Sequence, residues 1–209
     1  METLSFIWDM DGTLVDSYPA IVPAVKQACG ECGLFFEPDY IREQVIRSSV
    51  GSFLESLSVK DTALLKERFN NLNDSNIEKI QSMPHAREVL SFLVDAGHRN
   101  FVYTHRGASC QAILKQCGLF PYFTEIVTAL DGFPRKPAPD AIRYLMRKYE
   151  LQPERCFYVG DRRIDMEAAS NAGTGSILLL EPGSPTKPSG QESYIIRDLS
   201  QICEIAASI

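Results

Sequence analysis

The sequence predicts a doubly wound α/β fold, in which a parallel sheet has helices on both faces, together with a small α-helical cap subdomain. Three observations predict it: strand-length apolar runs recur along the chain, helical patterns separate most of them, and one connection is far longer than the others. The chain has 209 residues, of which 44% are hydrophobic. That length fits one buried core with a modest insertion.

Short apolar runs predict the strands of the sheet, which are expected at Leu4–Trp8, Phe101–Thr104, Glu125–Val127, Cys156–Val159, Ile177–Leu180 and Tyr194–Ile196. Helical patterns lie between or after them, at Glu88–Ala96, Ser109–Cys117, Asp140–Tyr149, Ile164–Ala172 and Leu199–Ala207. Short connections between strands and helices make the strands parallel. We therefore expect the functional site at the carboxyl ends of the strands.

Residues 18–83 form the long connection after the first strand, and they exceed an ordinary strand–helix loop. Two stripes of apolar residues with helical spacing occur within them: Ile21, Val25 and Ala28, and then Leu64, Leu65, Phe69 and Leu72. We assign residues 1–17 and 84–209 to the α/β core and residues 18–83 to the helical cap. Asp16 or Ser17 is expected to cap the first helix of the cap.

Composition limits the partners and the compartment. No apolar run approaches the roughly 20 residues that cross a bilayer, and no signal-like segment begins the chain, so we expect a cytoplasmic protein with no membrane partner. The net charge of −6 argues against binding to nucleic acid. The six cysteines are scattered along the chain and are expected to be reduced thiols. Nothing in the sequence indicates the oligomeric state.

The strongest chemical signal is Asp9-Met10-Asp11-Gly12-Thr13, which directly follows the first apolar strand. Two acids separated by one residue at a strand end can project into the same pocket, and Gly12 lets the backbone turn away. At the mouth of a buried sheet a charge is costly unless it binds a cation or takes part in a reaction. The motif therefore predicts a reactive or metal-binding site.

With this motif and three others, the chain resembles the haloacid dehalogenase superfamily, in its phosphatase branch with an α-helical cap. Its layout is similar to that of phosphoglycolate phosphatase-like members. The resemblance covers nearly the whole chain. Besides Asp9–Thr13, the matching motifs are Thr104 at the end of the second strand, Lys136 in Lys136-Pro137-Ala138-Pro139, and Gly160-Asp161-Arg162-Arg163-Ile164-Asp165. The core would then be Rossmann-like.

The resemblance implies that Asp9 is the nucleophile that forms a phospho-aspartate, and that Asp11 is the general acid and then the general base. It also implies Mg²⁺ as the cofactor, held by Asp9, the backbone carbonyl of Asp11, and Asp161. The chemistry agrees, because a carboxylate is repelled by a dianionic phosphate ester unless cations neutralise the site. Mg²⁺ prefers oxygen ligands. Lys136 would offset the remaining negative charge.

Supporting roles follow from the same resemblance. Thr104 and the backbone N–H of His105 would hold phosphate oxygens, and Asp165 would orient Lys136 or a metal-bound water. Two positions depart from the pattern of many relatives, which have Asn in place of His105 and Ser in place of Arg162. His105 either touches the substrate or acts through its backbone, and Arg162 either adds positive charge to the site or forms a salt bridge at the helix start.

The favoured function is hydrolysis of a small phosphorylated metabolite. The alternative is phosphoryl transfer within a sugar phosphate, as in the related β-phosphoglucomutases, and a non-catalytic binding module is the remaining class. Dehalogenation is disfavoured because the dehalogenases lack a carboxylate at the position of Asp11. Arg47, Ser48 and Ser49 are candidates for substrate selection from the cap, although an exposed turn is the favoured interpretation of that segment.

Overall fold

The computed structural model describes residues 3–209, and its centre is a parallel sheet. Within these residues six strands pair side by side in the order β5-β4-β1-β6-β7-β8, each parallel to its neighbours. The strands are β1 (Ser5–Trp8), β4 (Arg99–Tyr103), β5 (Glu125–Val127), β6 (Cys156–Gly160), β7 (Gly175–Leu179) and β8 (Tyr194–Ile196). The predicted α/β fold class is confirmed.

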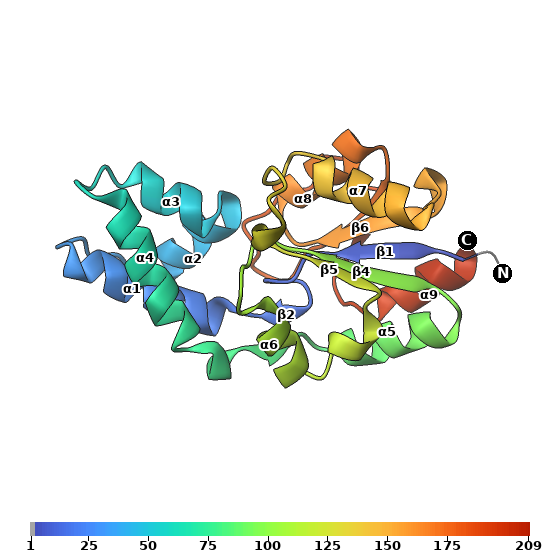
Figure 1. The fold of residues 1–209 in the computed structure, drawn as a ribbon, viewed down its shortest axis with the longest axis horizontal. Coiled ribbons are helices and arrows are strands. Elements are labelled where there is room, and N and C mark those ends of the chain that lie inside the picture. Colours follow the sequence, from blue (N-terminus) through green and yellow to red (C-terminus); the bar gives the residue numbers. More distant parts are fainter. Residues whose placement is uncertain (1–2) are drawn as a thin grey trace. The chain divides into compact units, whose positions relative to one another are not determined.

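Helices cover both faces of this sheet (Figure 1). Helices α7 (Asp140–Tyr149) and α8 (Arg163–Ala172) lie on one face, and α5 (Ala86–Asp95), α6 (Cys110–Gln116) and α9 (Gln201–Ser208) lie on the other. All four residues of β1 are buried, as expected for a central strand that is covered on both sides. Short 3₁₀ helices at Phe120–Tyr122, Ala129–Asp131 and Pro153–Arg155 lie in the connections.

The order of the strands explains where a site can form. Strand β1 lies between β4 and β6, so the strand order runs outward in opposite directions on its two sides. Doubly wound sheets bind ligands at such a point, at the carboxyl ends of the strands. Trp8 at the end of β1 pairs with Val102 of β4 and Val159 of β6. The residues that follow these three positions therefore meet at one edge of the sheet.

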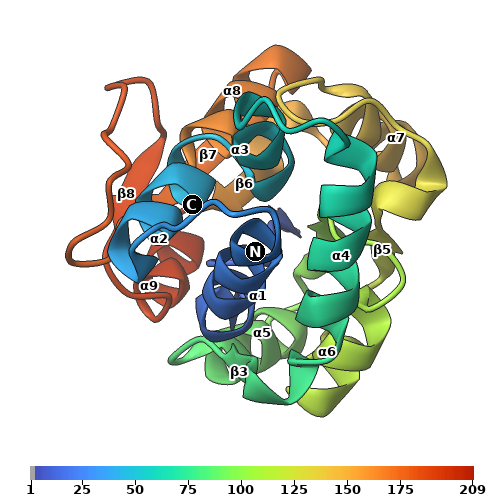
Figure 2. The same cartoon turned by 90° about the vertical axis from the view of Figure 1, so that its left-hand side faces the viewer.

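The chain divides into two compact units, and the second consists of Asp16–Gln81. It contains helices α1 (Tyr18–Glu31), α2 (Pro38–Arg47), α3 (Val50–Ser56) and α4 (Thr62–Asp74) and a 3₁₀ turn at Ile77–Lys79 (Figure 2). These helices share their own apolar core, which includes Val25, Ile41, Leu54 and Leu65. The short strands β2 (Val15–Asp16) and β3 (Gln81–Ser82) pair with each other where the chain passes between the units.

Two local expectations for the helical segment were wrong. Leu64 is 61% exposed, whereas Leu65 and Phe69 are buried. Adjacent helix positions differ by about 100° in direction, so Leu64 and Leu65 cannot both face the same core. Ser17 is the N-cap residue of α1, but its side chain makes no capping hydrogen bond. Its backbone has helical angles instead of the extended conformation that side-chain capping needs.

Other features agree with the composition. In the described part of the chain all six cysteines are free. Residues 3–209 contain no helix of the length and apolarity that a membrane crossing requires. Arg47 is the last residue of α2 and Ser48 begins the turn before α3; both are exposed, and Arg47 pairs with Glu43 of its own helix. That arrangement matches the exposed turn that the sequence favoured for this segment.

Candidate active site

The turn after β1 places two acids at the edge of the sheet. The backbone N–H of Asp9 still donates to the Val159 carbonyl at 2.8 Å, and the chain then reverses because the N–H groups of Leu14 and Val15 donate to the Met10 carbonyl. Gly12 has a φ of 82°, a left-handed conformation that favours glycine. The side chain of Met10 is buried in the core between the two acids. The turn therefore fixes Asp9 at the strand end and carries Asp11 beyond it.

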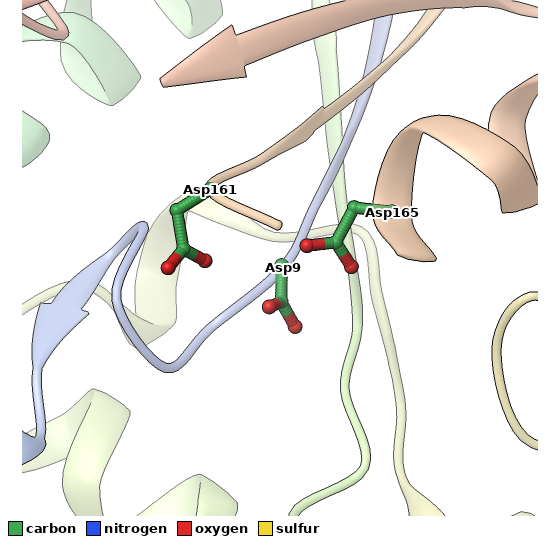
Figure 3. Close-up of side chains that lie close together, drawn as sticks. All are labelled: Asp9, Asp161 and Asp165. Atoms are coloured by element: carbon green, nitrogen blue, oxygen red, sulfur yellow. The ribbon is translucent and has the colours of Figure 1, made fainter. Parts of the chain in front are cut away.

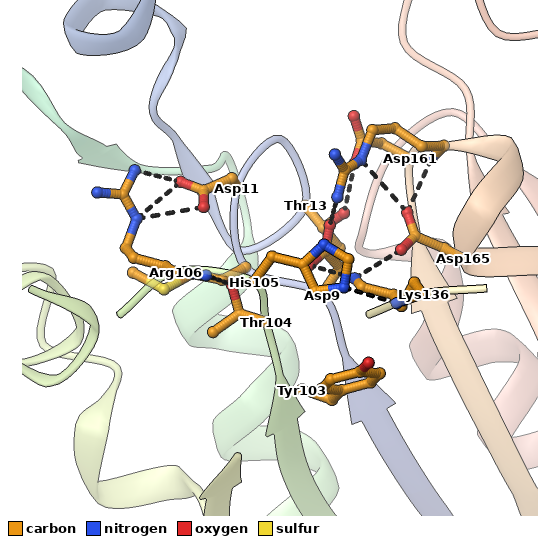
Figure 4. A network of polar contacts seen from close by, with 12 residues as sticks. Asp9, Asp11, Thr13, Tyr103, Thr104, His105, Arg106, Lys136, Asp161 and Asp165 are labelled. Atoms are coloured by element: carbon orange, nitrogen blue, oxygen red, sulfur yellow. Dashed lines mark hydrogen bonds and ion pairs between the residues drawn. The ribbon is translucent and has the colours of Figure 1, made fainter. Parts of the chain in front are cut away.

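Lys136 is the centre of a buried polar group, which we call the Lys136 group. Its Nζ donates to Asp9 Oδ1 at 2.7 Å and to Asp165 Oδ1 at 2.7 Å (Figure 4). It also donates to the hydroxyl of Tyr158 at 2.8 Å. An ammonium group has three N–H donors, so each one has a partner. The side chain of Lys136 is fully buried. The ammonium position is thus fixed by three contacts from three separate segments of the chain.

Tyr158, on β6, connects this ammonium to the sheet. Its hydroxyl donates to the Tyr103 carbonyl at the end of β4 at 2.8 Å while it accepts from Lys136. Burial and the carboxylates of Asp9 and Asp165 raise the pKa of Tyr158 well above its usual value, so the hydroxyl keeps its proton. The centroid of the Tyr103 ring also lies 5.3 Å from Nζ, within the range of cation–π attraction.

The Asp9 carboxylate lies between two cations. Lys136 contacts its Oδ1, and Arg162 Nη2 donates to its Oδ2 at 3.0 Å. Burial alone would raise the pKa of Asp9, but the positive charges of Lys136 and Arg162 outweigh it and lower the pKa to about 2. Asp9 is therefore ionised at neutral pH, the state that a carboxylate nucleophile requires.

Arg162 lies at the start of α8 and faces the carboxylates of the site. Its backbone N–H donates to Asp165 Oδ2 at 3.1 Å, while its guanidinium reaches Asp9. Both sequence-based interpretations of this residue therefore apply: it adds positive charge to the site and it contacts an acid in the first turn of the helix. Gly160 precedes this segment, and a Cβ there would come within 2.5 Å of the Asp165 side chain. Only glycine allows Asp165 to pack this closely.

Asp9, Asp161 and Asp165 form a group that could hold a metal ion (Figure 3). One carboxylate oxygen from each lies within 4.8 Å of the others. Burial raises the pKa of Asp161 to about 7, against the opposing effect of Arg162. A buried carboxylate that is costly to ionise gains from a divalent cation, and three carboxylates suit a hard ion such as Mg²⁺. The donor set fits the expected cofactor. Thr13 Oγ1 donates to Asp161 at 3.2 Å and orients it.

His105 is held by the loop that carries Lys136. Its Nε2 accepts from the Lys136 backbone N–H at 2.8 Å. Burial, together with the positive charges of Lys136 and Arg135, lowers the pKa of His105 to about 3, so the ring is neutral. A neutral ring that accepts at Nε2 carries its proton on Nδ1, so the 3.4 Å approach of Arg135 Nε to Nδ1 is not a hydrogen bond. The structure gives His105 a third role, as an anchor for the lysine loop.

Thr104 is buried directly after β4, and its Oγ1 accepts from the Arg106 backbone N–H at 3.1 Å. Arg106 in turn forms a separate ion pair with Asp11, at 2.6 Å between Nη2 and Oδ1. Figure 4 shows this pair on one side of the site and the Lys136 group on the other. The side chain of Asp11 therefore faces a guanidinium rather than the carboxylate group of Asp9, Asp161 and Asp165.

Comparison with known proteins identifies the family of this chain. The family model described as haloacid dehalogenase-like hydrolase matches residues 6–179. The chain belongs to this family. The resemblance inferred from the four motifs is thus confirmed, and the segment that matches includes Asp9, Asp11, Thr104, Lys136 and Asp161.

Individual members of the haloacid dehalogenase-like family are similar over most of their length. A phosphoglycolate phosphatase of Vibrio vulnificus YJ016 is 28% identical over 95% of this chain and 93% of its own. One from Pseudomonas fluorescens Pf-5 is 30% identical over 90% of this chain and 73% of its own. The crystal structure of a predicted phosphoglycolate phosphatase from Haemophilus somnus 129PT, at 23% identity, has the same fold with a TM-score of 0.81 and covers 99% of each chain.

Sequence reasoning missed two residues of this haloacid dehalogenase-like site, Tyr158 and Arg106. Tyr158 lies inside the predicted strand Cys156–Val159, where an aromatic residue needs no functional explanation. The available signal was its hydroxyl, because a tyrosine in a fully buried strand needs a hydrogen-bond partner. Arg106 follows Thr104 and His105 in a loop, and arginine in a loop is normally solvated. Only the fold shows that it is buried against Asp11.

Proposed function

We propose that this chain is a Mg²⁺-dependent phosphatase that hydrolyses phosphate monoesters of small metabolites through a phospho-aspartate on Asp9. The observation that supports it best is the state of Asp9: a buried, ionised carboxylate at a strand end, held by Lys136 at 2.7 Å and Arg162 at 3.0 Å. Those contacts orient the carboxylate and supply the positive charge that an attack on a phosphate dianion needs. An exposed acid on a binding surface would not need two cation contacts to a buried carboxylate.

The reaction has two steps. Asp9 attacks phosphorus, the bond from phosphorus to the leaving oxygen breaks, and a proton from Asp11 goes to that oxygen. Water then attacks the phospho-aspartate and gives a proton to Asp11, and the bond between phosphorus and Asp9 breaks. Lys136 neutralises charge throughout and Thr104 holds a phosphate oxygen. Lys136 itself is kept in place by Asp165, Tyr158 and the anchored loop, so its charge needs no rearrangement during the reaction.

Mg²⁺ would be held by Asp9, Asp161 and the backbone carbonyl of Asp11. When bound, the ion supplies a positive charge that stabilises the charge on the transferring phosphoryl group. Asp165 accepts from Lys136 at Oδ1 and from the Arg162 backbone N–H at Oδ2, so it contacts both the lysine and the start of α8. We therefore assign Asp165 to the orientation of Lys136.

The similar Vibrio and Pseudomonas proteins are named phosphoglycolate phosphatases, so we propose 2-phosphoglycolate as the first substrate to examine. Residues 18–83 are proposed to act as the cap that selects the leaving group, since the core residues recognise phosphate and metal only. The core chemistry is compatible with any monoester that the cap admits.

A phosphate-release assay tests this function. The purified protein is offered 2-phosphoglycolate, glycerol 3-phosphate, glucose 6-phosphate and p-nitrophenyl phosphate with Mg²⁺, and again with EDTA. We expect release with at least one ester in Mg²⁺ and none in EDTA. Calcium should inhibit, because its longer bonds and higher coordination number displace the attacking groups. Full activity in chelator would refute the metal role, and no release from any ester would refute the phosphatase.

A mutase is distinguished in the same assay. Glucose 1-phosphate is added to the panel, and glucose 6-phosphate is measured beside free phosphate. A phosphatase releases phosphate in step with the loss of the ester. Formation of glucose 6-phosphate without free phosphate would instead indicate transfer within a sugar phosphate.

A further inference from the structure

Arg106 is built into the site through its backbone as well as its side chain. Its N–H donates to Thr104 Oγ1 at 3.1 Å, and its carbonyl accepts from the Ala129 N–H at 3.0 Å. The residue is 8% exposed, and burial of an arginine is costly unless it is paired. The loop after β4 thus presents a fixed guanidinium to the site.

The contacts between this guanidinium and Asp11 are unequal for the two carboxylate oxygens. Asp11 Oδ1 accepts from Nη2 at 2.6 Å and from Nε at 3.1 Å, whereas Oδ2 accepts only from Nε, at 3.2 Å. Within residues 3–209 the hydrogen bonds and the ion pair of the Asp11 side chain all run to Arg106. The planar guanidinium therefore sets the plane of the carboxylate and holds Oδ1 more firmly than Oδ2.

From this geometry we propose that Arg106 is a positioning residue that fixes the orientation of the Asp11 carboxylate for proton transfer to and from the substrate. The proposal rests on the phosphatase activity proposed above. In the first step the Asp11 carboxyl group gives its proton to the leaving oxygen, and in the second step it receives a proton from the attacking water.

A purely structural role for Arg106 predicts a different pattern. Removal of a structural arginine would reduce the rate for every ester by the same factor. Loss of orientation at Asp11 harms only proton transfer, so the damage depends on how strongly the leaving group needs a proton. An alkyl phosphate releases a strongly basic alkoxide, whereas p-nitrophenyl phosphate releases a stabilised phenolate.

The test compares Arg106→Gln, Arg106→Lys, Asp11→Asn and the double variant with Arg106→Gln and Asp11→Asn. Single-turnover release of the alcohol or phenol is measured with p-nitrophenyl phosphate and with the alkyl ester of the panel that the unaltered protein cleaves fastest. We expect Arg106→Gln to slow the alkyl ester about tenfold or more and the aryl ester much less. Lysine should restore part of the loss, because it keeps the charge but not the paired donors.

The double variant separates orientation from structure. If Arg106 acts through Asp11, Arg106→Gln should add little to the loss that Asp11→Asn already causes. Lys148→Gln is the control, since Lys148 also pairs with one carboxylate, that of Glu125 at 2.8 Å, but within the α/β unit and not in the helical unit proposed to select the leaving group. It should show no dependence on the ester. Because both esters are measured on the same preparation, partial misfolding would lower both rates equally.

Equal losses with both esters, or additive losses in the double variant, would overturn the positioning role while the phosphatase assignment stood. Absence of phosphate release by the unaltered protein would overturn the proposed function itself, and this inference with it. The two failures are therefore distinguishable.

Discussion

The two ion-pair groups of the site, one around Lys136 and one between Arg106 and Asp11, differ in how completely the protein encloses them. Lys136, Asp9 and Asp165 have side chains at most 1% exposed, and every ammonium donor has a partner. The Asp11 side chain is 22% exposed. Full enclosure suits Lys136 and Asp165, which keep one charge and position during the proposed reaction, whereas Asp11 must exchange protons with the leaving group and with water.

This difference explains why both groups occur in one site. A buried ammonium with three partners is already oriented before the substrate arrives, so it stabilises the transition state without rearrangement. A general acid and base has to be reached by its proton acceptor and donor.

Replacement of the nucleophile should have the largest effect. Asp9→Asn removes the attacking oxygen, and turnover should fall by roughly 10³-fold or more for every ester. Asp11→Asn should instead produce a loss that is larger for alkyl esters than for p-nitrophenyl phosphate. Steady-state rates with both esters measure this contrast. If Asp9→Asn kept even a tenth of the activity, after allowance for deamidation, the assignment of the nucleophile would be wrong.

Removal of each cation should affect stability unequally. Lys136→Met leaves Asp9 and Asp165 buried without their ammonium partner, which should cost about 3–5 kcal/mol in the free energy of unfolding. Arg106→Met leaves Asp11 where water can reach it, and the cost should be about 1 kcal/mol. Urea denaturation in chelator measures both.

The exposed pair of Arg68 and Glu31 provides the control for this comparison. Both side chains are more than 40% exposed, so Arg68→Met should change the free energy of unfolding least of the three variants. A loss for Arg106→Met equal to that for Lys136→Met would show that enclosure does not distinguish the two groups.

Tyr158→Phe should have a smaller effect within the Lys136 group. The variant keeps the ring but leaves one N–H of Lys136 and the Tyr103 carbonyl without the hydroxyl between them. An unsatisfied buried polar group costs about 1–3 kcal/mol. We expect a loss of stability in that range and a lower kcat with little change in KM. Unchanged stability would mean that water replaces the hydroxyl and that the group is less enclosed than its contacts indicate.

His105 should make the free energy of unfolding change gradually with pH. Its pKa falls from 6.5 to about 3 on folding, so between these values the unfolded chain binds more protons than the native protein. Stability should therefore rise with pH through this window, with His105 contributing up to about 1.4 kcal/mol per pH unit. His105→Gln keeps an acceptor for the Lys136 N–H but cannot titrate, so its stability should rise less steeply. Parallel curves for the two proteins would contradict a neutral, buried His105.

The sequence by itself determined the fold class and the order of the elements, because both depend on local patterns. The runs Glu125–Val127, Asp140–Tyr149 and Tyr194–Ile196 coincide with β5, α7 and β8. It also indicated Asp9 as a candidate site residue, since an acid pair directly after a buried strand is costly without a function, and it indicated Lys136 and Asp161 through the resemblance of their motifs to those of the family. Their catalytic roles remain proposals. Local patterns were less successful within the helical segment, where the inclusion of Leu64 in the buried stripe was wrong.

Only the tertiary structure decided which polar groups meet. Lys136 is 22 residues from Tyr158, which lies on β6, and Arg106 is 95 residues from Asp11. No short-range sequence pattern therefore links either residue to its partner. The role of His105 depended on the Lys136 backbone N–H, which lies 31 residues away. A parallel sheet brings strand ends together regardless of their separation in sequence, and each strand end carries a loop whose side chains have no periodic signal. The strand order therefore decides which charged side chains become partners, and the sequence next to each charged residue does not specify that order.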